Sequence, residues 1–316
     1  MKKWLVVFLI LFLILFALLY LFIPNVISIS RKISVKANAE GLYRNLEVHK
    51  KWQLWWPGTD TTIATDRPEQ IFYLNGYAYT IEDKSINSLS ISISDNKIST
   101  KTLLHIIPLK TDSVKLVWTG AMATSINPLI RIHRYFKAKD IERNLEKILE
   151  GMKTFFSKNE NIYGIAIKQE AVVDSILIST YATSAGYPTI PFIYGLIDQL
   201  KNYTRGQSAK ETGYPMLNVS TTDSINFLTK VALPVNKKLK DSGTISYKWM
   251  LGGGKILVTE IKGGPHSIEK AFTQMEQYVS DYNRLAPAIP FRSLVTDQMK
   301  EPDTNKWVTR IFWPVL

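Results

Sequence analysis

The sequence contains no cysteine among its 316 residues. This absence excludes disulfide bonds, zinc sites built on cysteine, thiol nucleophiles and a lipidated N-terminal cysteine. Histidine is also scarce, with four residues. His49, His105 and His133 have no Asp, Glu or His partner at the spacing of a metal site. We therefore expect no metal ion and no cofactor.

Acidic residues are too few to balance the basic ones. Lys and Arg together number 39 and Asp and Glu 27, so the formal net charge is +12. Such an excess suits nucleic acid or an anionic membrane surface. The basic residues are spread over the whole chain, without a basic block or a recognition-helix pattern. We read them as a solvated surface, keep a membrane as the alternative, and expect no nucleic-acid partner.

One long apolar run stands near the start of the sequence. Two lysines precede an uncharged segment over residues 4–23, which as a helix would span ~30 Å, the thickness of a bilayer core. A cleaved signal peptide would have a shorter apolar region and small residues at its cleavage site. The run predicts a single-pass anchor over residues 1–25 that contacts the lipid bilayer through residues 4–23. We expect a cell-membrane protein with its N-terminus inside and its body outside the cytoplasm.

The next segment alternates apolar and polar residues, as half-buried strands do. A long helix follows, with apolar residues at steps of three and four. Together they predict a first domain over residues 26–158, with an antiparallel sheet and a closing helix. The predicted strands are 26–35, 71–81, 88–94, 97–107 and 113–122, and the predicted helices are 37–46 and 137–158.

This segment resembles the polyketide cyclase/START-like (SRPBCC) superfamily. The residues that carry the resemblance are ISISRKISVKANAEGLYRNL (27–46), the W-x-x-WW-P motif and the terminal helix. The resemblance implies a helix-grip fold with a deep apolar cavity between the sheet and that helix. Trp52, Trp55 and Trp56 would either line the mouth of this cavity or serve as packing in the core or at its rim.

The remainder of the chain contains an internal repeat. TKVALPV (229–235) and TRIFWPV (309–315) stand 80 positions apart, since 309 − 229 = 80. Two further matches at the same offset are ILIST (176–180) on ILVTE (256–260), and Phe192 on Phe272. Chance repetition is the alternative, and three gapless matches argue against it.

The repeat predicts two strand–helix–strand–strand units, at about 171–235 and 252–315, within a second domain over residues 159–316. Each unit is too small to bury its sheet face alone, so the two should share one core and a groove along a pseudo-twofold axis. The connection at 159–170 is either a flexible joint or a strand that extends one sheet. The fold class is therefore α+β: a transmembrane helix, a START-like sheet domain and a duplicated βαββ domain.

ILVTEIKGGPHSIEKAFTQMEQYVSDY (256–282), followed by TRIFWPV, looks like the GyrI-like effector-binding domain that accompanies AraC-type regulators. The resemblance implies a pocket between the repeats that is lined by aromatic residues and often contains a glutamate that attracts cations. This sequence departs from the pattern. Arg310 stands where the family usually has an acidic residue, Lys230 is its repeat mate, and His266 replaces an aromatic residue.

An arginine at this place changes the expected ligand from a cation to an anion, because a guanidinium suits a carboxylate or a phosphate. Alternatively, Arg310 reaches solvent or pairs with Glu260 or Asp297. Strand alternation places Arg310 and Phe312 on one face and Ile311 and Trp313 on the other.

These observations favour non-enzymatic binding of a hydrophobic or amphipathic small molecule, as a sensor or a carrier. The candidate binding residues are mostly aromatic. They are Trp52, Trp55, Trp56, Tyr187, Tyr194, Trp249, Phe272, Tyr278, Arg310, Phe312 and Trp313.

Two other functions remain open. The first is a hydrolase or cyclase for a lipophilic substrate, for which Glu260 and His266 are the best available acid and base. The second is a protein-interaction scaffold whose pockets are collapsed core. The identity of the ligand and the oligomeric state are left open.

Overall fold

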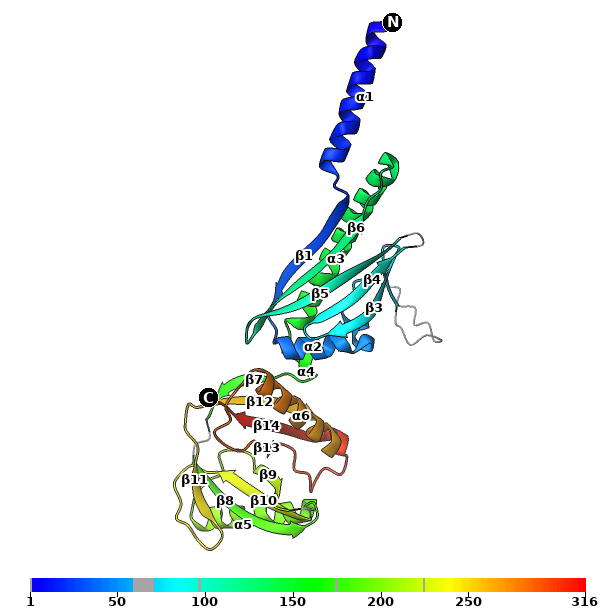
Figure 1. The fold of residues 1–316 in the computed structure, drawn as a ribbon. Coiled ribbons are helices and arrows are strands. Elements are labelled where there is room, and N and C mark those ends of the chain that lie inside the picture. Colours follow the sequence, from blue (N-terminus) through cyan, green and yellow to red (C-terminus); the bar gives the residue numbers. More distant parts are fainter. Residues whose placement is uncertain (1, 59–70, 96–97, 174–175, 224) are drawn as a thin grey trace. The chain divides into compact units, whose positions relative to one another are not determined.

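The computed structural model describes residues 2–58, 71–95, 98–173, 176–223 and 225–316. The chain divides into two compact units, Met1–Ile162 and Tyr163–Leu316. Each unit contains helices and one antiparallel sheet (Figure 1). The α+β class predicted from the sequence is confirmed.

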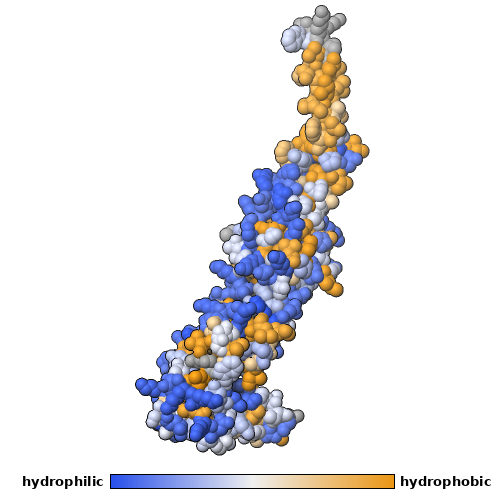
Figure 2. All heavy atoms as spheres, turned by 90° about the vertical axis from the view of Figure 1, so that its left-hand side faces the viewer, coloured by the Kyte–Doolittle hydropathy of each residue, from blue (hydrophilic) through white to orange (hydrophobic). Residues whose placement is uncertain are grey.

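Helix α1 (Lys2–Phe22) carries exposed apolar side chains over residues 7–16 (Figure 2). Its C-terminal end is held by Arg131, whose Nε donates to the carbonyl of Ile23 at 2.8 Å and whose guanidinium lies 4.6 Å from the centre of the Tyr20 ring. In the described ranges, no helix combines the length and apolarity needed to cross a membrane. The predicted transmembrane anchor at 1–25 is therefore not supported.

The first sheet is antiparallel and curves around a long helix (Figure 1). Its six strands lie in the order β1-β6-β5-β4-β3-β2. The strands are β1 (Val26–Val35), β2 (Ile71–Leu74), β3 (Tyr77–Ser85), β4 (Ser88–Ser94), β5 (Ser99–Lys110) and β6 (Ser113–Ala123). The predictions at 26–35, 88–94 and 113–122 agree closely with β1, β4 and β6, whereas residue 97 of the predicted strand 97–107 lies outside the described residues.

The single strand predicted at 71–81 is wrong. Asn75 and Gly76 have positive φ values of 50° and 80° and join β2 to β3 as a hairpin. A two-residue Asn-Gly turn with both φ values positive matches the twist of the flanking strands, so it reverses the chain.

Helices α2 (Ala39–Glu47), η1 (His49–Leu54) and α3 (Pro128–Phe156) complete the first unit, and α4 (Asn159–Tyr163) leads to the second. Helix α3 begins earlier than the predicted residue 137. The side chain of Asn127 caps it by accepting from the backbone N–H of Leu129 at 2.9 Å. A capping amide followed by proline is a strong helix start, and the apolar periodicity alone did not reveal it.

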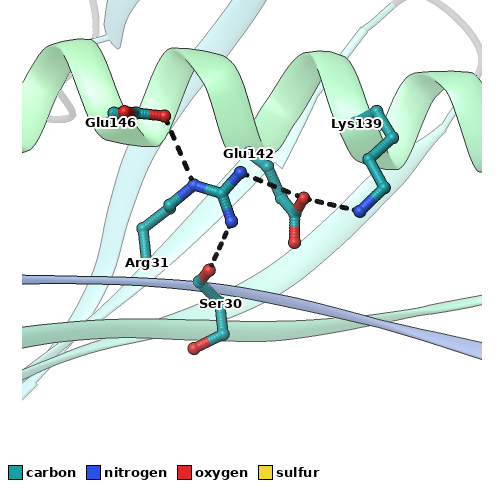
Figure 3. Close-up of polar contacts among 5 residues, drawn as sticks. All are labelled: Ser30, Arg31, Lys139, Glu142 and Glu146. Carbon is teal, nitrogen blue, oxygen red and sulfur yellow. Dashed lines mark hydrogen bonds and ion pairs between the residues drawn. The ribbon is translucent and has the colours of Figure 1, made fainter.

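A buried carboxylate fixes α3 onto β1 (Figure 3). Glu142 accepts from Arg31 Nη2 at 3.2 Å and from Lys139 Nζ at 2.9 Å, and Arg31 Nε also lies 3.5 Å from Glu146. The side chain of Glu142 is 8% exposed. Because an unpaired buried charge is costly, the two cations hold this carboxylate and the helix that carries it in place.

Aromatic side chains pack together between the first sheet and α3. Trp52, Trp55 and Trp56 are all buried. The Trp52 ring lies 5.3 Å from Phe72 of β2, and the Trp55 ring lies 5.9 Å from Phe156 of α3. Of the two alternatives for these tryptophans, the structure therefore shows packing in the core.

The second sheet has eight strands in the order β11-β8-β10-β9-β13-β14-β12-β7. This order is symmetric about the β9–β13 pair, and it unites two strand–helix–strand–strand repeats. The first repeat consists of β8 (Ile176–Ala185), α5 (Ile190–Gly206), β9 (Met216–Thr221) and β10 (Asn226–Pro234). The second consists of β12 (Lys255–Lys262), α6 (Pro265–Asp281), β13 (Phe291–Leu294) and β14 (Val308–Pro314), with the short helix η2 (Thr304–Lys306) before β14.

The edge strands are exchanged between the repeats. Strand β7 (Lys168–Ala171) precedes the first repeat but pairs with β12 of the second. Strand β11 (Ser246–Trp249) precedes the second repeat but pairs with β8 of the first. The end of the 159–170 connection therefore extends a sheet, which was one of the two alternatives.

The strand register changes one residue equivalence that the internal sequence repeat suggested. Lys230 of β10 lies opposite Tyr181, and Arg310 of β14 lies opposite Glu260. Tyr181 is therefore the structural counterpart of Glu260, whereas the gapless offset of 80 assigns that place to Thr180. A slip of one residue reverses which face each side chain occupies, so only the pairing decides the equivalence.

Helices α5 and α6 cover one face of the second sheet. Ile178, Val231 and Leu233 from the strands form one buried core with Ile193 and Ile197 of α5. Successive side chains of a strand point to opposite faces. Residues that alternate with this core therefore lie on the face away from the helices.

Candidate ligand-binding groove of the second unit

A cavity of about 540 Å³ lies on the helix-free face of the second sheet, over the first repeat. Lys230 and Ala232 of β10 line it, and they alternate with the buried Val231 and Leu233. Its other strand residues come from β8, β9, β11, β13 and the end of β14. The cavity is lined by Leu177, Ser179, Thr180, Tyr181, Met216, Leu217, Asn218, Lys230, Val231, Ala232, Ser246, Lys248, Trp249, Met250, Ala288, Ile289, Phe291 and Pro314.

A smaller cavity of about 170 Å³ adjoins the first over the second repeat. Met216, Met250 and Phe291 line both cavities. The two therefore form one groove across the middle of the sheet, with a large part over the first repeat and a small part over the second. We call this the groove, and its two parts the first and second cavity.

Two pairs of equivalent residues explain why the halves differ in volume. Ala232 lies opposite Ser179 in the first half, and Phe312 lies opposite Val258 in the second. The Phe312 ring stacks on Phe291 with centroids 5.1 Å apart and planes 13° apart. The second half is thus filled by larger side chains at the places where the first has a methyl group and a hydroxymethyl group.

The charged residues also differ between the halves. Lys230 and Lys248 line the first cavity, and none of the described residues around it is acidic. In the second half, Arg310 Nε donates to Glu260 at 2.8 Å, and this bond raises the pKa of the Arg310 guanidinium. Glu170 also lines the second cavity. The first cavity is therefore cationic, and the second has compensated charges.

Three of the residues predicted from the sequence line the groove. Trp249 lies at the first cavity and is 61% exposed, so its ring is accessible at the rim. Arg310 and Phe312 line the second cavity and share one face, as strand alternation predicted. Arg310 pairs with Glu260, which was the alternative to its contact with an anion.

Three predicted aromatic residues belong to the helices on the opposite face. Tyr194 of α5 accepts at its hydroxyl from the backbone N–H of Gln298 at 2.6 Å, and burial raises its pKa to about 12. Phe272 and Tyr278 lie on α6, where Tyr278 stacks on Tyr282 with centroids 4.4 Å apart. These side chains support the fold, and they do not line the described groove.

Two further predicted residues lie outside the lining. Trp313 alternates with Phe312 along β14, so it lies on the helix-covered face. Tyr187 is exposed, and its hydroxyl accepts from Arg292 at 2.7 Å while its ring meets Phe227 edge-on.

The candidate acid–base pair is not assembled. Glu260 is engaged by Arg310, and His266 lies exposed in the first turn of α6. Across the described ranges, no hydrogen bond joins the two side chains. General acid–base catalysis needs both groups within hydrogen-bond reach of one substrate.

Several lining residues were missed by the sequence analysis, namely Ala232, Met216, Met250, Lys248 and Ile289. The repeat offset held one usable signal, because it places Ala232 on Phe312. A small residue in one repeat and a large residue at the equivalent position of the other indicate that the two halves of the groove differ in volume. Lys248 gave no signal, since it belongs to an edge strand exchanged between the repeats.

No family model matches the sequence, and no curated protein matches it. Solved structures with distant similarity include the C-terminal domain of EcmrR, which is 18% identical over 48% of this chain and 98% of that chain, with a TM-score of 0.41. SAV2435 bound to tetraphenylphosphonium is 14% identical over 48% of this chain and 94% of that chain, with a TM-score of 0.32. The ZhuI aromatase/cyclase from Streptomyces sp. R1128 is 11% identical over 41% and 92%, with a TM-score of 0.32.

Proposed function

We propose that this protein binds a hydrophobic or amphipathic small molecule in the groove and does not transform it, acting as a sensor or a carrier. The observation that carries the proposal is the first cavity, which remains open because Ala232 and Ser179 leave space that Phe312 and Val258 fill in the other half.

The size and lining of the first cavity suit such a ligand. Small-molecule sites are typically about 300–1,000 Å³, mostly apolar, with a few polar groups that orient the ligand. Leu177, Met216, Trp249 and Ile289 supply apolar surface here. Burial of an apolar ligand against them contributes roughly 25 cal/mol for each Å² removed from water.

Thermal unfolding of the full chain tests the proposal. The neutral probe is naphthylmethanol, a rigid aromatic alcohol small enough for the first cavity. A ligand that binds only the folded state at about 100 times its Kd adds about 2.7 kcal/mol of stability. A saturable upward shift in the unfolding temperature of the second unit supports the proposal. If no neutral or charged naphthalene derivative produces a shift, the groove is a collapsed core and the scaffold function takes precedence.

Hydrolase or cyclase activity has less support. Glu260 is held by Arg310, and His266 lies at the start of a helix on the other face of the sheet. Turnover of a lipophilic ester that disappears in both Glu260→Gln and His266→Ala would restore the enzymatic alternative.

We also propose that the two units are a START-like domain over residues 26–158 and a GyrI-like domain over residues 159–316. The sequence motifs support this assignment, and so do the two strand–helix–strand–strand repeats of the second unit. Cooperative unfolding of residues 159–316 expressed alone would agree with it, and a failure of that segment to fold would argue against it.

We propose, separately, that α1 attaches the protein to a lipid bilayer. The exposed apolar side chains of Phe8, Leu11 and Leu15 support this proposal, because an apolar helix without a partner avoids water. The full chain should sediment with membranes and residues 24–316 should not. Leu11→Arg should weaken the attachment, and protease protection in the same preparation tests whether the body lies outside the cytoplasm. Recovery of the full chain in the soluble fraction would contradict the proposal.

A further inference from the structure

In each half of the groove, a long cationic side chain lies at an equivalent position of the sheet. We call the row of three residues that lie opposite one another on neighbouring strands at this position a rung. In the first half, Lys230 lies between Tyr181 of β8 and Asn218 of β9. In the second half, Arg310 lies between Glu260 and Ser293. Residues directly opposite one another on neighbouring strands point to the same face. Each rung therefore presents three polar side chains in a row.

The neighbour of the cation determines what the rung can bind. Glu260 neutralises Arg310 through a bond of 2.8 Å. Its structural counterpart is Tyr181, which has a phenol hydroxyl donor in place of a carboxylate. In the described part of the chain, no salt bridge involves Lys230. Its charge is therefore available to a bound molecule, whereas that of Arg310 is already satisfied.

All three residues of the first rung line the first cavity. Asn218 is held in position because its Nδ2 donates to the carbonyl of Pro290 at 2.9 Å. Tyr181 is 59% exposed, so its hydroxyl is accessible from solvent. A lysine ammonium, a phenol hydroxyl and an amide are all hydrogen-bond donors, and donors in a row suit the oxygens of an anion.

A second cation in the cavity also favours an anionic ligand. Lys248 on β11 lines it as a second cation and lies opposite Leu177. The structural counterpart of Lys248 is Glu170, which lies opposite Ile256 in the second half. At both places, then, the first half has a residue that favours an anion where the second half has a carboxylate.

We propose that the first cavity selects molecules with an apolar body and an anionic group, a carboxylate or a phosphate, which is bound by the rung of Tyr181, Lys230 and Asn218. The apolar body lies over Ala232 and Met216 towards Trp249, and Lys248 adds attraction at the far end. This inference rests on the proposed binding function. It moves the anion contact from Arg310, where the sequence suggested it, to the repeat mate of that residue.

A matched series of probes tests the selection with the full chain. Naphthoate, naphthylmethanol and naphthylmethylammonium share one ring system and differ in charge. Isothermal titration should give naphthoate a Kd at least about ten-fold lower than that of the alcohol, because hydrogen bonds to a charged group are stronger than those to a neutral one. The ammonium compound should bind most weakly, and added salt should reduce the advantage of naphthoate.

Two substitutions test whether the first rung, formed by Tyr181, Lys230 and Asn218, causes the preference for an anionic ligand. Tyr181→Glu recreates beside Lys230 the pairing of Glu260 with Arg310, and Lys230→Met removes the cation. Each should abolish most of the preference for naphthoate over the alcohol, and a cooperative unfolding transition of the second unit shows that each variant is folded. Glu260→Gln is the matched control in the other half, and it should leave the preference for naphthoate as it is.

The outcomes separate this inference from the function on which it rests. Equal affinity for all three probes, or a preference for naphthoate that survives both Tyr181→Glu and Lys230→Met, overturns the anion selection and leaves the binding function standing. If Glu260→Gln strengthens the preference for naphthoate instead, the released Arg310 binds the anion and the site belongs to the second half. Absence of binding by every probe in the unmodified protein overturns both.

Discussion

Ala232 and Phe312 occupy equivalent positions in the two halves of the second sheet. Ala232 lies opposite Met216, and Phe312 lies opposite and stacked on Phe291. This additional aromatic ring contributes to the difference between a cavity of about 540 Å³ and one of about 170 Å³. A duplicated fold has thus produced one open half and one filled half.

The first prediction follows from this pair. Ala232→Phe should fill the first cavity and abolish the shift in unfolding temperature caused by naphthylmethanol. The unliganded protein should keep its stability within about 1 kcal/mol, because the new ring enters existing space and does not overpack a core. Undiminished binding by this variant would place the ligand elsewhere.

Phe312→Ala is the reciprocal control. It should leave binding at the first cavity intact while it enlarges the second. Removal of a fully buried Phe costs about 3–5 kcal/mol, and Phe312 is half-buried, so a loss of roughly 2 kcal/mol is expected in denaturant unfolding. A loss of ligand binding in this variant would show that the second half also holds the ligand.

The second prediction concerns alkaline pH. Burial raises the pKa of Tyr194 from 10.0 to about 12, so between these values the unfolded chain has released a proton that the folded chain retains. Stability depends on pH through this difference in bound protons, and it should fall as pH rises from about 10 to about 12. Below pH 10 the Tyr194 contribution is fully present.

Tyr194→Phe tests this assignment, since it keeps the ring and removes the hydroxyl. The variant should lose the bond to the Gln298 N–H and show a shallower fall in the stability of the second unit over the same pH range. A fall as steep as that of the unmodified protein would assign the effect to other tyrosines.

The third prediction concerns the carboxylates between β1 and α3 (Figure 3). Glu142→Gln removes the buried carboxylate that pairs with Arg31 and Lys139. Because both cations are partly exposed, the first unit should lose about 1–3 kcal/mol of stability. Glu146→Gln is the matched control. Its side chain is 64% exposed, so the loss should stay below about 1 kcal/mol. Equal effects in denaturant unfolding would contradict the role of Glu142.

The fourth prediction uses one substitution at two glycines. Gly76→Ala should destabilise the β2–β3 hairpin by about 1 kcal/mol, because Gly76 has φ +80°. Gly195→Ala should stabilise by about 0.5–1 kcal/mol, because Gly195 lies within α5 and a Cβ there meets nothing within 4 Å. Each effect is measured on the unfolding transition of its own unit. The same sign at both positions would contradict the assignment of these backbone conformations.

Local patterns predicted most of the secondary structure, for reasons that lie within each segment. Alternation marked β1, β4 and β6, and apolar periodicity marked α3, because these signals depend on neighbours close in the sequence. The hairpin at Asn75–Gly76 was missed, although Asn-Gly is a strong turn signal. The start of α3 was missed because capping by Asn127 lies outside the apolar pattern.

The candidate groove was only partly predictable. Trp249, Arg310 and Phe312 were named from the sequence and line it. Tyr194, Phe272 and Tyr278 are equally aromatic but lie on the helices. Composition could not separate the two groups, because the face that a side chain occupies depends on which elements pack together.

The sequence by itself determined that the second half of the chain is a duplication, because TKVALPV and TRIFWPV repeat at one offset. It also determined that both copies carry a cation after the threonine. Only the tertiary structure decided which cation is available. The pairing of strands placed Glu260 beside Arg310 and Tyr181 beside Lys230. This pairing depends on a register of one residue between strands about 50 positions apart in the sequence. The alternation of apolar and polar residues shows which residues of a strand share a face, but it does not show which residue of another strand lies opposite.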